Sequence, residues 1–201
     1  MSIRGGLGAA LEPRNLPNLI TGVRIGLTPV LVVLLIYPGR TASVLAAATF
    51  FLACWSDFLD GYLARRHGLT STLGKLLDPL ADKLIVTAAL VMLAAIPREP
   101  RVPAWMVVVI VGRELAVTGL RAIATSEGIV LAAEELGKYK MILQMLALHG
   151  LLLHYRFFGV DFFSGGMYFL WPSLVLSLWS GVEYHVRVIR RATAPALPHA
   201  N

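Results

Sequence analysis

Apolar residues dominate the chain in six long runs, and each run is separated from the next by a short polar or breaker-rich segment. A helix needs about 20 such residues to cross a bilayer. The runs cover residues 19–37, 42–62, 76–96, 102–124, 141–158 and 162–186, with breakers at 38–39, 97–103 and 159–166. None shows the polar–apolar alternation of a transmembrane β-strand. The pattern therefore predicts six transmembrane helices.

The two ends of the chain differ from the runs between them. Residues 7–19 mix apolar and polar positions, which predicts a short interfacial helix leading into the first run. Residues 195–201 are typical of a disordered tail. No internal repeat or change of composition marks a second unit, so we expect one transmembrane domain over residues 1–194.

Composition narrows the class of protein. Of 201 residues, 57% are hydrophobic and 15% are charged, and the mean hydropathy is +0.70. Soluble domains carry about 25% charged residues. The single cysteine, Cys54, argues against a disulfide scaffold. A soluble enzyme and a disordered chain are excluded, and an all-α integral membrane protein is expected.

The positive charge of the chain is distributed unevenly about the runs. The net charge is +6, but no basic stripe with interleaved aromatic residues predicts a nucleic-acid partner. Cations gather instead at both termini and at the second and fourth connections. This side holds Arg4, Arg14, Arg65, Arg66, Lys75, Lys138, Lys140, Arg187, Arg190 and Arg191, and the other holds Arg40, Arg98, Arg101 and Arg156. The asymmetry orients the termini toward the cytoplasm.

Acidic residues are scarce, yet four of the twelve lie within 26 residues of apolar helix and turn. They are Asp57, Asp60, Asp78 and Asp82. An acid inside a membrane helix costs about 2.5–3.5 kcal/mol on insertion scales. Spacings of i,i+3 and i,i+4 put each pair on one helical face. If the turn at 66–73 makes the two helices antiparallel, all four carboxylates converge near the cytoplasmic interface.

The residues around these acids indicate what they bind. Carboxylates without His or Cys favour Mg²⁺, Mn²⁺ or Ca²⁺ over zinc. Gly61, Ala64 and Gly74 leave the backbone open to a bulky anionic group. Arg65 and Lys75 are cations that suit phosphate. Together these residues predict metal-assisted phosphoryl-type transfer.

Two other interpretations of the acids remain open. The aspartates could form structural ion pairs with Arg65, Arg66 and Lys83. Alternatively, intramembrane acids line the ion path of small cation transporters. A transporter predicts acids spread over the depth of the membrane, whereas these acids gather at one interface beside cations.

The acidic stretch resembles the signature of the CDP-alcohol phosphatidyltransferases. The matching residues are Asp57-x-x-Asp60-Gly61-x-x-Ala64-Arg65 and, after eight residues, Gly74-x-x-x-Asp78-x-x-x-Asp82. The resemblance implies a six-helix enzyme, commonly a homodimer, that uses CDP-diacylglycerol in a bacterial-type inner membrane. The four aspartates would hold two divalent ions, Mg²⁺ or Mn²⁺. Asp57, Gly61, Ala64, Arg65 and Gly74 would contact the CDP moiety, and Asp82 would also be the general base.

A second group of charged residues lies on the later runs. It comprises Arg113 and Glu114 midway through the fourth run, Arg121 two turns further on, Lys138 and Lys140 at the start of the fifth, and Arg187 near the end of the sixth. Such cations suit an anionic acceptor. The alternative is local pairing, of Arg113 with Glu114 or an aspartate and of Arg187 with Glu183 at i,i+4, with Lys138, Arg190 and Arg191 as positive-inside flanks.

Several further stretches resemble one branch of that family, the phosphatidylglycerophosphate synthases. They are residues 15–21 with Arg24, residues 73–83, residues 112–121 and residues 137–140. The branch implies glycerol 3-phosphate as the acceptor, with Arg113, Arg121, Lys138 and Lys140 as ligands of its phosphate. The branch usually has Thr where this chain has Met141, which removes a possible phosphate-binding hydroxyl. Phosphatidylglycerol, as in cardiolipin synthases, and inositol phosphate are the alternative acceptors.

Overall fold

The computed structural model of the chain describes residues 16–37, 39–67, 72–129 and 135–193, with side chains except at 16–20, 57–67, 72–79 and 135. The helices are α2 (Leu16–Ile36), α3 (Arg40–His67), α4 (Thr72–Ala95), α5 (Ala104–Ser126), α6 (Glu135–Leu153) and α7 (Phe162–Ala192). These helices match the six predicted runs one to one. The expected tail, and residues 7–15 of the expected interfacial helix, lie outside the described residues, and residues 16–19 begin α2.

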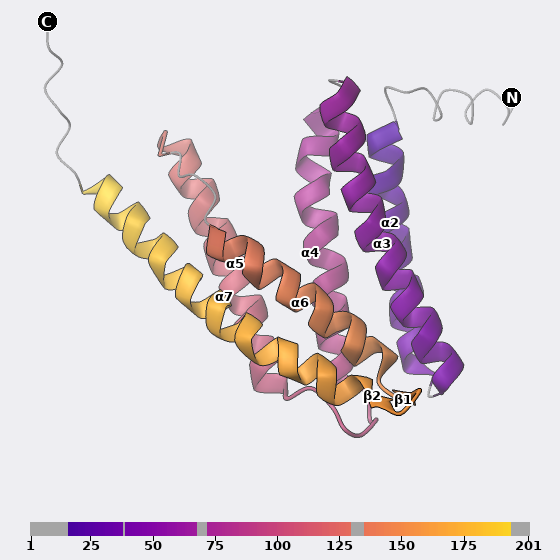
Figure 1. Ribbon diagram of the computed structural model, residues 1–201. Helices are drawn as coiled ribbons and strands as arrows, with labels where there is room; N and C mark the ends of the chain where they lie inside the picture. Colours follow the sequence, from indigo (N-terminus) through magenta and orange to yellow (C-terminus); the bar gives the residue numbers. More distant parts are fainter. Residues whose placement is uncertain (1–15, 38, 68–71, 130–134, 194–201) are drawn as a thin grey trace, which may run out of the picture.

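The helices form two groups that contact each other (Figure 1). Helix α2 packs against both α3 and α4, while α6 and α7 pair extensively and α5 packs against α7. Contacts of α6 with α3 and of α5 with α4 join the groups. The chain direction alternates, so the end of α3 and the start of α4 lie at the same end of the bundle (Figure 1).

A close backbone contact holds α6 against α7. A Cβ atom on Gly166 of α7 would lie 2.7 Å from the Leu151 nitrogen and 2.8 Å from the Ala147 oxygen of α6. A Cβ atom on Gly150 would lie 2.9 Å from the Gly166 Cα atom. Real Cβ atoms do not approach other atoms so closely, so glycine at both positions is what allows the helices to meet at this distance.

A short hairpin precedes α7, formed by β1 (Arg156–Phe157) and β2 (Val160–Asp161). Gly159 has φ +81° and supplies the turn. The prediction of a breaker over 159–166 is wrong beyond residue 161, because Gly165 and Gly166 lie inside α7. Asp161 begins that helix as its N-cap and accepts a hydrogen bond from the Ser164 backbone N–H at 3.1 Å.

The interior is apolar, and so is much of the outside. The largest buried apolar side chains include Phe50, Leu31, Leu90, Met106, Leu148 and Leu170. Large apolar side chains such as Val108, Tyr168 and Trp179 are nevertheless more than 60% exposed. Apolar surface on this scale marks contact with lipid or a partner.

The described helices differ in length and hydropathy, which decide whether a helix can cross a bilayer. Within the described residues, α7 alone is both long and apolar enough, and Thr21–Ile36 and Arg40–Ser56 are shorter apolar segments. The all-α architecture is thus confirmed, and the number of six membrane spans stays a prediction.

Candidate functional site

The backbone brings the two pairs of aspartates to one end of the bundle. Asp57 and Asp60 lie in the last turns of α3, and Asp78 and Asp82 lie in the first turns of α4. Only residues 68–71 separate these helices. A donor set made of carboxylates alone suits Mg²⁺ or Mn²⁺, so the residues present fit the expected ions.

The metal site itself stays a prediction. The side chains of Asp57, Asp60 and Asp78 lie outside the described residues, and the side chains that are described contain no group of three acids, histidines or cysteines. The residues expected to contact CDP lie on the same helix ends: Gly61, Ala64 and Arg65 on α3, and Gly74 on α4. The side chains of Ala64 and Arg65 are likewise not described.

Asp82 is bound by an arginine from another helix. Arg24 on α2 donates from Nη1 to Asp82 Oδ1 at 3.1 Å. The arginine side chain is 1% exposed and that of Asp82 is 50% exposed. The sequence indicated Arg24 only through the resemblance of the first run. A lone cation in an apolar run is nevertheless a signal, because the free-energy cost of placing a charge there requires a specific partner.

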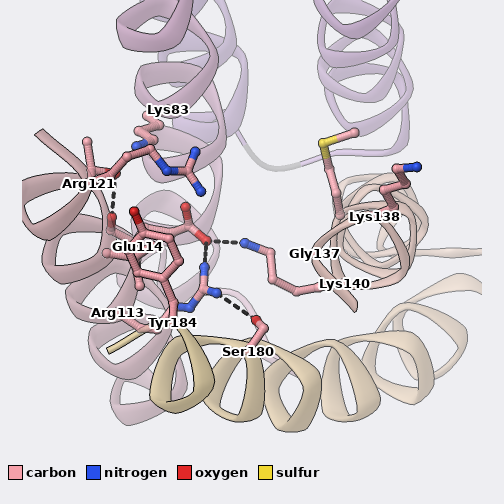
Figure 2. Close-up of a pocket in the computed structure, with 12 residues that line it drawn as sticks. Lys83, Arg113, Glu114, Arg121, Gly137, Lys138, Lys140, Ser180 and Tyr184 are labelled. Carbon is pink, nitrogen blue, oxygen red and sulfur yellow. Dashed lines mark hydrogen bonds and ion pairs between the residues drawn. The ribbon is translucent and has the colours of Figure 1, made fainter. Parts of the chain in front are cut away.

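Four of the five expected acceptor cations surround one cavity of about 360 Å³. They are Arg113 and Arg121 from α5 and Lys138 and Lys140 from α6 (Figure 2). Arg187 lines a different groove along α7 and pairs with Glu183, as the local interpretation of its i,i+4 spacing predicted. The cavity also has walls from α4 and α7, through Lys83, Ser180 and Tyr184.

Glu114 pairs with two of these cations. Arg113 Nη1 lies 2.9 Å from Glu114 Oε1, and Lys140 Nζ forms an ion pair with the same oxygen. Both cation side chains are largely buried, and Glu114 is 25% exposed. The alternative that Arg113 pairs with Glu114 is therefore confirmed. A carboxylate between two cations offsets the cost of burying them.

Helix α7 supplies a recess for the Arg113 side chain. A Cβ atom on Gly181 would lie 3.0 Å from Arg113 Nε and 3.2 Å from its Cγ, so the side chain lies across this glycine. Arg113 Nη2 then donates to Ser180 Oγ at 2.6 Å (Figure 2). The two contacts fix Arg113 between α5 and α7.

The other cations of the cavity are arranged differently. Arg121 is exposed, and its Cζ lies 5.4 Å from the centre of the buried Tyr184 ring, a cation–π contact. Lys83 donates to Thr118 Oγ1. Lys138 is exposed, and its ammonium group points away from the Glu114 cluster (Figure 2).

A second cavity of about 220 Å³ shares a wall with the first and contains Asp82. Five residues line both cavities: Lys83, Glu114, Gly137, Lys140 and Met141. Arg121 and Lys138 line only the first, and Asp82 lines only the second. Three of the expected phosphate ligands, Arg113, Arg121 and Lys138, thus lie across a common wall from the expected general base, and Lys140 lies in that wall.

Sequence reasoning did not select several of the residues that line these cavities. The sequence indicates Lys83 as an ion-pair partner of the aspartates and contains Thr118 within the stretch 112–121 that resembles the family branch, and it gives no signal of its own for Ser180. The usable signals were the adjacency of Lys83 to Asp82 and the four-residue spacing of Ser180 and Tyr184, which puts both on one face of α7.

Comparison with known proteins shows the family to which the chain belongs. The family model described as CDP-alcohol phosphatidyltransferase matches residues 14–179. The chain is 42% identical to the CDP-diacylglycerol–glycerol-3-phosphate 3-phosphatidyltransferase of Bacillus subtilis, over 85% of this chain and 93% of the relative.

Relatives with the same name occur in distant organisms. One from Rickettsia typhi is 35% identical over 85% of this chain and 95% of its own length. The second such enzyme of Arabidopsis thaliana is 36% identical over 88% of this chain and 80% of its own length. Because the family model matches most of the sequence, this chain is a member of the CDP-alcohol phosphatidyltransferase family.

Proposed function

We propose that the chain transfers the phosphatidyl group from CDP-diacylglycerol to sn-glycerol 3-phosphate, which yields phosphatidylglycerophosphate and CMP. The relatives in three distant organisms carry the name of this activity. The observation that carries the proposal is the pair of adjoining cavities, one lined by cations and the other containing Asp82. An acceptor with a phosphate at one end and a hydroxyl at the other matches this pair.

The acceptor binds with its phosphate in the first cavity. Arg121 is exposed there and pairs with no described carboxylate, so it contacts the phosphate directly, and Lys138 joins it after a side-chain rotation. Arg113 and Lys140 contribute positive potential from the buried side while bound to Glu114. Arg187 is not included, because it lines another groove.

The reacting hydroxyl lies in the second cavity beside Asp82. The hydroxyl oxygen attacks the β-phosphorus of CDP-diacylglycerol, and the bond from this phosphorus to the bridging oxygen breaks. CMP leaves with the bonding electrons, and the hydroxyl proton passes to the Asp82 carboxylate. Arg24 holds that carboxylate in place from α2.

The donor occupies the open ends of α3 and α4. Asp57, Asp60, Asp78 and Asp82 are proposed to hold two divalent ions, Mg²⁺ or Mn²⁺, with Gly61, Ala64, Arg65 and Gly74 against the CDP moiety. Such ions, when bound, would neutralise charge on the diphosphate. The lipid tails stay in the bilayer beside the exposed apolar helix faces.

The proposal includes the setting of the enzyme. Six membrane spans in a single domain, both termini on the cytoplasmic side of a bacterial-type inner membrane, and a homodimer are carried forward from the sequence pattern and the family resemblance. Cysteine-labelling from each side of the membrane at residues 4 and 101 tests the orientation. Cross-linking in native membranes tests the dimer.

An acceptor panel tests the reaction. Purified protein is incubated with CDP-diacylglycerol, Mg²⁺ and one acceptor at a time, and CMP release is measured. We expect release with glycerol 3-phosphate and far less with phosphatidylglycerol or inositol phosphate. Equal or greater release with either alternative acceptor would overturn the assignment. Metal flux through proteoliposomes without lipid turnover would favour a transporter instead.

A further inference from the structure

We infer that Glu114 binds the middle hydroxyl of a polyol-phosphate acceptor and thereby determines acceptor specificity. The inference rests on the proposed function and adds a residue to which that function assigned only the pairing of two cations. Glycerol 3-phosphate carries its phosphate, its middle hydroxyl and its reacting hydroxyl on successive carbons. A residue that reads the middle group must lie between the other two binding sites.

Glu114 has this position. Arg121 and Lys138 line only the first cavity, Asp82 lines only the second, and Glu114 lines both. Glu114 therefore lies in the shared wall, together with Lys83 and Lys140, between the cavity of Arg121 and Lys138 and the cavity of Asp82. This placement follows the order of phosphate, middle hydroxyl and reacting hydroxyl along the acceptor. Figure 2 shows the Glu114 carboxylate between its two partners, Arg113 of α5 and Lys140 of α6.

The carboxylate has a further oxygen to offer. Arg113 and Lys140 both bind the Oε1 atom of Glu114. Neither of these two side chains binds the other carboxylate oxygen, Oε2. The side chain is 25% exposed, so a ligand can reach it. A carboxylate accepts hydrogen bonds and cannot donate them, so a hydroxyl group suits Oε2 and a phosphate oxygen does not.

Pairing with Glu114 offsets the cost of burying Arg113 and Lys140, but it does not by itself explain an acid inside a cavity that binds phosphate. A carboxylate in a phosphate-binding cavity repels the phosphate. By pairing with Arg113 and Lys140 it also occupies two cations that would otherwise bind the phosphate. Contact with the middle hydroxyl accounts for an acid at this point. Sites that bind a substrate hydroxyl reject the analogue that lacks it, because a buried polar group is then left without its partner.

The test compares two acceptors that differ only in that hydroxyl, glycerol 3-phosphate and 3-hydroxypropyl phosphate. We expect the unaltered protein to prefer the first by on the order of 10- to 100-fold in kcat/KM for CMP release. Glu114→Met should reduce this preference to about 2- to 3-fold, and Glu114→Gln, which retains a neutral acceptor oxygen, should give an intermediate value.

Ser180→Ala is the matched control. It removes the other hydrogen bond of Arg113 and leaves the carboxylate in place. It should lower kcat/KM for both acceptors by the same factor, with the preference unchanged. Loss of the preference in Ser180→Ala would show that any disturbance of the cluster has this effect, and would overturn the inference.

Three other results are decisive. If the Glu114 variants lower activity toward both acceptors equally, Glu114 only supports Arg113 and Lys140. If the unaltered protein does not distinguish the two acceptors, no residue recognises the middle hydroxyl. Both results overturn the inference and leave the proposed function intact. No CMP release with either acceptor overturns the proposed function as well.

Discussion

Arg24 and Asp82 lie 58 positions apart and on different helices, yet the arginine donates to the aspartate at 3.1 Å from a site that is 1% exposed. The pair joins α2 to α4 at the residue proposed as the general base. It therefore links the packing of the first helix to the orientation of the reacting carboxylate.

Replacing Arg24 should affect both stability and turnover. Arg24→Met removes a charge-assisted hydrogen bond, which we expect to cost about 1.5 kcal/mol because Asp82 is half exposed. The unfolding temperature in detergent and kcat should both fall. Arg24→Lys keeps the charge without the planar guanidinium and should be intermediate. Unchanged kcat in Arg24→Met would contradict a role in orienting Asp82.

Asp57→Asn should abolish CMP release. The substitution keeps the size of the side chain and removes one of the carboxylate charges expected to hold a divalent ion. CMP release is measured over a range of Mg²⁺ concentrations, with circular dichroism to show that the helices are retained. A variant with full metal-dependent activity would refute the assignment of the metal site.

Arg121 and Arg113 should behave differently, because Arg121 is exposed and Arg113 is largely buried and hydrogen-bonded to Glu114 and Ser180. Arg121→Gln should raise KM for glycerol 3-phosphate roughly 10-fold, the loss of one charged hydrogen bond, with the unfolding temperature nearly unchanged. Arg113→Gln should lower the unfolding temperature as well, because Glu114 and Ser180 lose a partner. Arg101→Gln, at an exposed cation three residues before the start of α5, is the control. Equal effects of Arg121→Gln and Arg101→Gln on KM would argue against the phosphate site.

The contact between α6 and α7 offers a sharp test of packing. Gly166→Ala forces a methyl group to within 2.7–2.8 Å of the α6 backbone, and we expect a loss of about 1–3 kcal/mol. Gly165→Ala is the neighbouring control, since nothing lies within 4 Å of its added Cβ. It should be neutral or should stabilise the helix by roughly 0.5–1 kcal/mol. Thermal unfolding in detergent measures both, and equal effects would contradict the close contact.

The N-cap of α7 should make a pH-dependent contribution to stability. The backbone N–H of Ser164 binds the Asp161 carboxylate and lowers its pKa below the usual value. The contribution is therefore present above the pKa of the unfolded chain, about 3.9, and disappears as the pH falls through the lower folded-state pKa. Asp161→Ala should lower the unfolding temperature at pH 7, and the difference should vanish in strong acid. Asp161→Asn still caps and should show no such pH dependence. A difference that persists in strong acid would contradict this account.

The sequence was sufficient for the helices and for the class of chemistry. Apolar run length predicted six helices because the membrane sets that length, and the four aspartates stood out because lipid makes acids costly. It was not sufficient for the first turns of α7, where Gly165 and Gly166 read as breakers. Gly166 instead allows the close approach of α6, and a contact with Gly150, 16 positions away, has no local pattern.

The interior of the site was also beyond the sequence. Arg113, Arg121, Lys138 and Lys140 could be assigned to one pocket from their place toward helix ends on one side of the membrane and from the family resemblance, whereas Arg187, assigned to the same pocket, lines another groove. The partners that these cations bind could not be predicted, since the pairing of Glu114 with Lys140 depends on how α5 and α6 cross. The same holds for Ser180 and Gly181, which act on Arg113 only because α7 lies against α5.

Helix α5 carries Arg113, Glu114, Thr118 and Arg121 on the side that faces the cavities. A small rotation of this one helix would shift Arg113, Arg121 and the Glu114 carboxylate together, against an opposite wall whose two helices are held in register by Gly150 and Gly166. A change of acceptor among related enzymes can therefore arise from a change in the position of α5 alone, without any change at the end of the bundle that carries the aspartates.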